Sequence, residues 1–242
     1  MHFTDKKKVF ITFIIIFITF CLSVESVFSD KKNDMKGRGY IIFEVNNADM
    51  HDLNSRLTSN NYSKLSNNIL SVGVGGHSVH KNKIIREGYL QCFLPLKKSS
   101  KIGGVEYNTS MSGMLGTRNW GYLVYSQGGT DIFPMLGFGF GGLIVRIREE
   151  DERNFDDVLK NPRESRLKAS MYGIINISLG IDKLFLRKET DTSHKGLGFG
   201  ARLGYRIALI KADWMNVAEG PDFYFTGPYV SMTFGGGYNK KE

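Results

Sequence analysis

The amino-acid sequence predicts an all-β, antiparallel fold, and three observations carry that prediction. Many short segments alternate apolar side chains with small or polar ones, and this period of two is typical of β-strands. Glycine is abundant, with 28 residues among 242, and proline is scarce, with 5. Most connections between the predicted strands are too short to hold the crossover helices that parallel strands need, so neighbouring strands are expected to be antiparallel.

The first 29 residues have the features of an export signal. Three lysines at 6–8 precede an apolar run at 9–24, and small residues follow that run. This arrangement predicts a signal peptide over residues 1–29. The alternative is that the segment stays attached as a membrane anchor. If it is removed, Cys92 is the only cysteine left, and an intramolecular disulfide is excluded.

Residues 30–67 are predicted to form an N-terminal tail with one short strand and one short helix. The strand candidate is YIIFEV at 40–45. The helix is predicted near residues 48–58, because the apolar residues of that segment fall on one side of a helix.

Residues 68–238 hold the other strand candidates and are predicted to form a closed β-barrel. The candidates lie at 68–77, 83–96, 104–115, 120–127, 133–147, 167–182, 196–209 and 224–238. These make eight strands without 40–45, and ten strands are possible if that segment and one missed strand are added. The last residues, 239–242, are predicted to be a polar tail.

The charged stretch at 148–166 interrupts the strands and is predicted to be a loop. Single-chain bacterial barrels have both termini in the periplasm and their longer loops outside the cell. With the eight strands above, 148–166 and 214–223 are expected outside, whereas 96–103 and 128–132 are expected to be periplasmic turns.

The stretch GLGFGARLGYRIAL at 196–209 indicates which solvent each face of a strand meets. Apolar residues occupy every second position, with glycine, alanine or arginine between them. A soluble sandwich or barrel would point the apolar residues inward and polar ones outward. Here the opposite faces are rich in glycine and serine, with isolated charges of both signs, which suits a narrow lumen. Together with the export signal, this pattern favours a transmembrane β-barrel whose apolar side chains face lipid.

Polar residues on the faces rich in small side chains are candidates for a network inside the lumen. The candidates are Glu87, Glu106, Asn108, Asn176, Arg202 and Arg206. Inward charges of opposite sign can pair across a narrow lumen and so avoid an uncompensated buried charge. We therefore interpret these residues as structural rather than catalytic.

The sequence predicts no catalytic, cofactor or metal site. His77 and His80 form an H-x-x-H pattern, which we interpret as part of a solvated turn because no third ligand is evident. Ser193 and His194 lack the nucleophile elbow and the assigned acidic partner of a hydrolase. The glycines of GLGFGARLG alternate within a strand, whereas a phosphate-binding loop joins a strand to a helix. The chain is therefore predicted not to be an enzyme.

Three segments resemble small, glycine-rich bacterial outer-membrane β-barrel proteins of unassigned role. They are FPMLGFGFGG at 133–142, GFGARLGYRIAL at 198–209 and GPDFYFTGPYVSMTFGGG at 220–237. Residues 52–77 have the same look, with a short helix before a glycine-rich strand. The resemblance implies a bacterial outer-membrane location, contact with outer-membrane lipid and insertion by barrel-assembly machinery. Such barrels often finish on an aromatic residue, whereas this chain continues past Tyr238 to NKKE.

The sequence thus predicts an antiparallel up-and-down transmembrane β-barrel with a structural or surface-interaction role. Side chains can fill an eight-stranded barrel, so bulk conduction is not expected. Two alternatives stay open: a soluble exported barrel of lipocalin type that binds an apolar ligand, and a narrow pore. The net charge of +8 fits contact with acidic lipid headgroups and equally an ordinary lysine-rich surface. Nucleic acid is not expected as a partner, because export separates the two and no recognition motif is present.

Overall fold

The computed structural model describes residues 34–150, 166–189, 193–211, 214, 220–222 and 225–240. The predicted signal peptide at 1–29 and most of the charged stretch at 148–166 lie outside the described residues.

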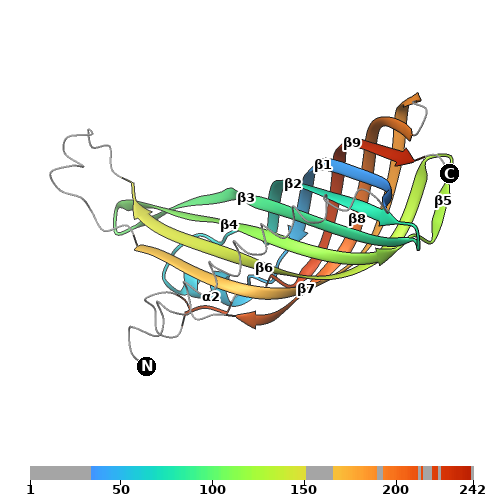
Figure 1. Cartoon of the computed structure of the whole chain (residues 1–242). Coiled ribbons are helices and arrows are strands. Elements are labelled where there is room, and N and C mark those ends of the chain that lie inside the picture. Colours follow the sequence, from blue (N-terminus) through green and yellow to red (C-terminus); the bar gives the residue numbers. More distant parts are fainter. Residues whose placement is uncertain are drawn as a thin grey trace, which may run out of the picture.

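Eight antiparallel strands form a closed barrel (Figure 1). They are β1 (Asp34–Asn47), β2 (Asn68–His80), β3 (Ile84–Ile102), β4 (Val105–Tyr122), β6 (Thr130–Glu149), β7 (Arg166–Glu189), β8 (Ser193–Lys211) and β9 (Gly227–Lys240). β1 pairs with both β2 and β9, and the pairing of β4 with β6 closes the circle. The three-residue β5 (Tyr125–Gln127) forms a small hairpin with the start of β6. The prediction of an eight-stranded up-and-down barrel is confirmed.

Two expectations about individual strands are wrong. Residues 40–45, expected in the N-terminal tail, lie in β1 and pair on both sides. Without β1, the facing edges of β2 and β9 would stay unpaired, which sheets avoid. The segments 104–115 and 120–127 were expected as two barrel strands. Residues 105–115 and 120–122 instead belong to the single strand β4, and 125–127 form the short β5. The two errors cancel in the count, and the barrel includes residues from Asp34 onward rather than from residue 68.

The two ends of the barrel differ in their connections. At the end that we call the turn end lie the start of β1, the end of β9, and the connections that follow β2, β4 and β7. The opposite end, the loop end, holds the longer connections and the helix α2 (His51–Ser59). It also holds the β3–β4 turn, where Gly103 and Gly104 both have positive φ, as a tight two-residue hairpin requires. The expectation that 96–103 lies at the opposite end from 148–166 is therefore wrong.

Four neighbouring strands extend beyond the rest of the barrel at the loop end (Figure 1). β3, β4, β6 and β7 contain 18 to 24 residues, whereas β1, β2 and β9 contain 13 or 14. A tilted strand needs about 9–11 residues to cross a bilayer. The longer strands therefore form a wall on one side of the barrel, long enough to project beyond the thickness of a bilayer.

The apolar side of α2 packs against the inner face of this wall. Leu53 and Leu57 are buried, as the helix predicted near 48–58 requires. Asn54 donates a hydrogen bond to the Leu65 carbonyl at 3.0 Å and accepts one from the Leu65 amide at 2.8 Å, which ties the following loop to the helix. In the described part of the chain, no helix is both long and apolar enough to cross a membrane.

An apolar cluster fills the lumen beneath α2, and we call it the loop-end cluster. Its members are Ala48, Met50, Leu53, Leu57, Leu65, Ile69, Phe93, Met111, Leu115, Leu143, Val145, Tyr172, Ile174, Trp214 and Phe225. Phe225 stacks between Phe93 and Tyr172, with ring centroids 4.8 and 5.4 Å apart. The β1–β2 connection, which carries α2, and Phe225 of the β8–β9 connection therefore fill the loop end of the barrel with packed side chains.

The outer surface of the barrel carries an apolar belt. The belt includes Ile41, Phe43 and Val45 on β1, Leu136 and Phe138 on β6, Ile177 and Leu179 on β7, Leu203 and Ile207 on β8, and Val230 and Met232 on β9. Leu203 is 61% exposed, whereas Arg202 and Arg206 beside it on β8 are 2% and 0% exposed. Apolar outside and charged inside is the arrangement of a membrane barrel and the reverse of a lipocalin-type barrel. The soluble-barrel alternative is therefore wrong.

Candidate functional site

Arg206 on β8 is the centre of one buried polar group in the lumen. Its guanidinium donates two hydrogen bonds to the Glu44 carboxylate on β1, at 2.5 and 2.7 Å, and a third to the Tyr89 hydroxyl at 3.1 Å. Gln91 donates to the same carboxylate at 3.2 Å. The guanidinium carbon lies 4.1 Å from the centre of the Tyr229 ring. A bidentate arginine–carboxylate pair is strong and geometrically specific, so it links β8 to β1, the two strands on either side of β9.

Arg202, four residues before Arg206 on the same face of β8, is the centre of a second group. It donates two hydrogen bonds to Asp182 on β7, at 2.7 and 3.2 Å, and one to Glu87 on β3 at 3.2 Å. Glu87 also accepts hydrogen bonds from the Tyr40 hydroxyl at 2.6 Å and the Asn119 amide at 2.8 Å. One arginine thus bridges two carboxylates from opposite sides of the lumen, and both carboxylates have further partners.

A third group lies nearer the turn end. Asp131 on β6 pairs with Lys36 at 2.5 Å and with Arg38 at 3.6 Å, both on β1. His77 on β2 lies 3.4 Å from Asp182 and so belongs to the group around Arg202. His77 is buried in a strand, so the interpretation of the H-x-x-H pattern as a solvated turn is wrong. In the described parts of the chain, no group of three or more His, Cys, Asp or Glu side chains could hold a metal ion.

The structure brings together four of the six residues expected in the lumen. Glu87, Arg202 and Arg206 lie in the groups above, and Asn176 donates to the Asn119 amide oxygen at 2.9 Å. Glu106 is exposed, and Asn108 instead accepts a hydrogen bond from Ser99 at 2.7 Å near the loop end.

The expected position of Glu106 and Asn108 is corrected by the orientation of β4. Met111 and Leu115 on this strand point into the lumen, where they join the loop-end cluster. The polar positions that alternate with them, including Glu106 and Asn108, therefore face outward. The rule that apolar side chains face lipid fails here, because the part of the lumen near the loop end is itself apolar.

Several lumen residues were missed by the sequence analysis. The main ones are Tyr40, Glu44, His77, Asn119, Asp131 and Asp182. Asp182 could have been predicted, because it lies six residues after Asn176 on the same strand and therefore on the same face. Glu44 stayed hidden because its strand was placed outside the barrel.

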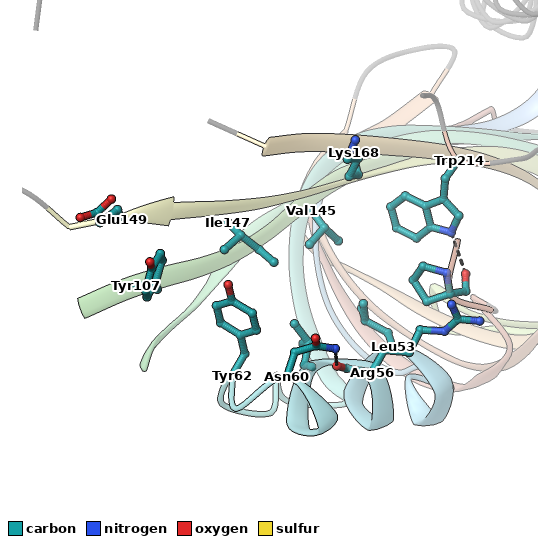
Figure 2. A pocket seen from close by; sticks show the side chains of 12 residues that line it. Leu53, Arg56, Asn60, Tyr62, Tyr107, Val145, Ile147, Glu149, Lys168 and Trp214 are labelled. Carbon is teal, nitrogen blue, oxygen red and sulfur yellow. Dashed lines mark hydrogen bonds between the residues drawn. The ribbon is translucent and has the colours of Figure 1, made fainter. Parts of the chain in front are cut away.

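A cleft of about 520 Å³ opens at the loop end, between α2 and the projecting wall. Figure 2 shows Leu53 and Tyr62 facing Val145 and Ile147 across it. Its rim carries both charge signs, from Arg56, Glu149 and Lys168. Trp214 borders one end, and its indole donates a hydrogen bond to the Pro221 carbonyl at 2.6 Å. The cleft combines an apolar floor with a polar rim, which is typical of binding sites.

The outward apolar belt and the inward ion pairs together decide the class of fold. It is that of an outer-membrane β-barrel. No protein-family model matches this barrel, and none of the curated proteins matches it in sequence.

Solved outer-membrane barrels do match it in structure, at low sequence identity. Ail, the attachment invasion locus protein of Yersinia pestis, has a TM-score of 0.42 and 10% identity, over 85% of this chain and 98% of Ail. Ail has also been solved in complex with the heparin analogue sucrose octasulfate. Neisserial surface protein A has a TM-score of 0.35 and 7% identity, over 85% of this chain and 96% of that protein. The outer membrane protease OmpT of Escherichia coli has a TM-score of 0.35 and 9% identity, over 88% and 98% of the two chains.

Proposed function

We propose that this chain is a bacterial outer-membrane protein with a surface-interaction role and a lumen that does not conduct solutes. The observation that carries the proposal is the filling of the lumen. Buried ion pairs around Arg202 and Arg206 occupy the middle of the lumen and the part toward the turn end. The loop-end cluster occupies the part under α2. With the lumen filled, the loop end is the part of the molecule that offers a recessed surface to a partner.

The orientation in the membrane follows from strand parity. An even number of strands brings the start of β1 and the end of β9 to one end, and in bacterial barrels that end is periplasmic. The turn end is then periplasmic, and the loop end with its cleft faces the outside of the cell. In this proposal residues 1–29 are a cleaved signal peptide. Barrel-assembly machinery inserts the chain, and the outward Phe234 on β9 supplies an aromatic residue near the end of the last strand.

The role that we propose is not enzymatic. The carboxylates and arginines described above are committed to one another inside the lumen rather than directed into the cleft. The cleft residues Arg56, Glu149 and Lys168 instead form a charged rim suited to contact with a partner.

Labelling of intact cells tests the location and orientation. In a Cys92→Ser background, Lys64→Cys places a thiol at the loop end and Lys83→Cys places one at the turn end; both positions are exposed. We expect a membrane-impermeant maleimide to label the first variant on intact cells and the second only after the outer membrane is opened. The reverse result would overturn the orientation, and equal labelling of both in a soluble periplasmic extract would overturn the location.

Planar-bilayer recording tests the filled lumen against the narrow pore. We expect the folded protein, identified by its changed gel migration after boiling, to give no steady conductance steps. Regular steps from such a preparation would show that the ion pairs leave a continuous path, and the pore would replace the surface role as the better proposal.

A further inference from the structure

The lipid-facing surface is interrupted by two arginines near the turn end. Arg86 on β3 lies between the inward-facing Ile85 and Glu87, so it points outward, and it is exposed. Arg118 on β4 lies between Thr117 and Asn119, both 0% exposed, and also points outward.

Trp120 lies between the two arginines on the outer surface. It is two residues from Arg118 on β4, on the same side of the strand, and it is the cross-strand partner of Arg86. The guanidinium carbon of Arg118 lies 5.6 Å from the centre of the Trp120 ring. The three side chains therefore form one outward cluster, which we call the arginine–tryptophan cluster.

The cluster has donors without acceptors. In the part of the chain that the structure describes, neither arginine forms an ion pair, and the Arg118 Nε is buried without a hydrogen-bond partner. The hydroxyl of Ser78, the cross-strand partner of Arg86, is buried and unpartnered as well. The buried carboxylates of Glu87 on β3 and Asp131 on β6 face the lumen instead. Glu106, the outward-facing carboxylate of β4 described above, lies at the loop end of the strand and forms no ion pair with either arginine among the described residues. Two adjacent cations without a paired carboxylate are complementary to an anion.

The height of the cluster in the membrane points to the kind of anion. Arg118 lies four residues from Tyr122, where β4 ends, and a tilted strand covers about 10 Å along the membrane normal over that length. An arginine side chain can extend across this distance to the headgroups while its stem stays in the apolar region. Trp120 and Tyr122 are the ring types that gather at this boundary. The guanidinium groups are therefore within reach of the lipid phosphates.

We propose that Arg86, Arg118 and Trp120 bind the phosphate headgroup of an anionic phospholipid in the membrane leaflet at the turn end. Guanidinium groups bind phosphate through paired, charge-assisted hydrogen bonds, and the indole packs against the upper part of the headgroup region. The proposal rests on the transmembrane orientation of the wall and does not need the surface-interaction role or a particular partner outside the cell.

Quenching of Trp120 by brominated lipids tests this site. The chain has two tryptophans, so Trp214→Phe leaves Trp120 as the only one. The Trp214→Phe barrel is folded into phosphatidylcholine vesicles, and brominated phosphatidylglycerol or brominated phosphatidylcholine is titrated in. Because each cation at the interface strengthens anionic lipid binding, we expect phosphatidylglycerol to be favoured roughly fivefold to twentyfold. With Arg86→Gln and Arg118→Gln added, the preference is expected to fall to about one.

The matched control removes the same charge far from the cluster. Lys64→Gln with Lys101→Gln neutralises two exposed lysines at the loop end, and the preference is expected to stay unchanged. Equal quenching by the two lipids in the Trp214→Phe barrel, or a preference that survives the arginine changes, would overturn the proposal. Failure of both lipids to quench Trp120 would also overturn it, in favour of a second barrel covering this surface. Gel migration before and after boiling shows in each case that the barrel is folded, and the cell-labelling result on orientation is independent of all these outcomes.

Discussion

The two halves of the lumen are lined by inward-facing residues of the same barrel, but the side chains in the two halves are of opposite kinds. Around Arg202 and Arg206 the buried charges are paired: Arg202 with Asp182 and Glu87, and Arg206 with Glu44. Under α2, the inward-facing positions of β4, β6 and β7 carry apolar residues, among them Met111, Leu143 and Ile174. One half is held by pairing and the other by packing.

Because of this difference, we expect the stability of the two halves to respond differently to substitution. A buried ion pair loses most when one partner is removed and little when both are replaced by apolar groups of similar size. An apolar cluster loses in proportion to the cavity that is left, and no second substitution elsewhere restores it unless it fills that cavity. The predictions below separate these two kinds of stability.

The largest effect is expected for Glu44→Leu, which leaves the buried Arg206 guanidinium without its carboxylate. The free energy of unfolding is expected to fall by about 3–5 kcal/mol, measured by urea unfolding in lipid vesicles. Adding Arg206→Met should recover most of this loss because no unpaired charge remains. If the double variant is as unstable as the single one, pairing is not what holds this half of the lumen.

An intermediate effect is expected for Leu57→Ala in α2. The side chain is 5% exposed within the loop-end cluster, and its truncation should lower the unfolding free energy by about 2–3 kcal/mol. Ser55→Ala, at an exposed position of the same helix, is the control and should change stability by less than about 0.5 kcal/mol. Equal effects of the two changes would mean that α2 does not close the loop end by packing.

The smallest effect is expected for Asp182→Asn. Arg202 keeps Glu87 as a counter-ion, so the unfolding free energy should fall by only about 1–2 kcal/mol. Combining Asp182→Asn with Glu87→Gln removes both carboxylates and should cost more than the sum of the two single changes. Additive losses would show that Arg202 does not depend on having at least one carboxylate.

The contrast between the halves also explains where sequence analysis succeeded and failed. On β8, residues 196–209 alternate between lipid and a polar lumen, so the inward positions of Arg202 and Arg206 could be predicted. On β4 the prediction was inverted, because Met111 and Leu115 face an apolar part of the lumen. Alternation shows that a strand has two faces, but it does not show which face is inside when both surroundings are apolar.

The partners of the lumen charges lay beyond sequence analysis for a different reason. Arg206 and Glu44 are 162 residues apart in the chain, and only closure of the barrel between β9 and β1 brings their strands near each other. The two arginines could be assigned to the lumen from the apolar residues that alternate with them on β8. The sequence did not show that Glu44, rather than Glu106, is an inward-facing carboxylate. That choice depended on whether 40–45 belongs to the barrel.

The sequence by itself determined the class of fold and the short helix, because a period of two and a one-sided apolar helix are local properties that survive any arrangement of the elements. Only the tertiary structure decided which strands close the barrel, which charges meet inside it and that α2 closes its loop end. Those outcomes depend on strand register and on contacts between distant segments, which alternation within a single segment does not encode.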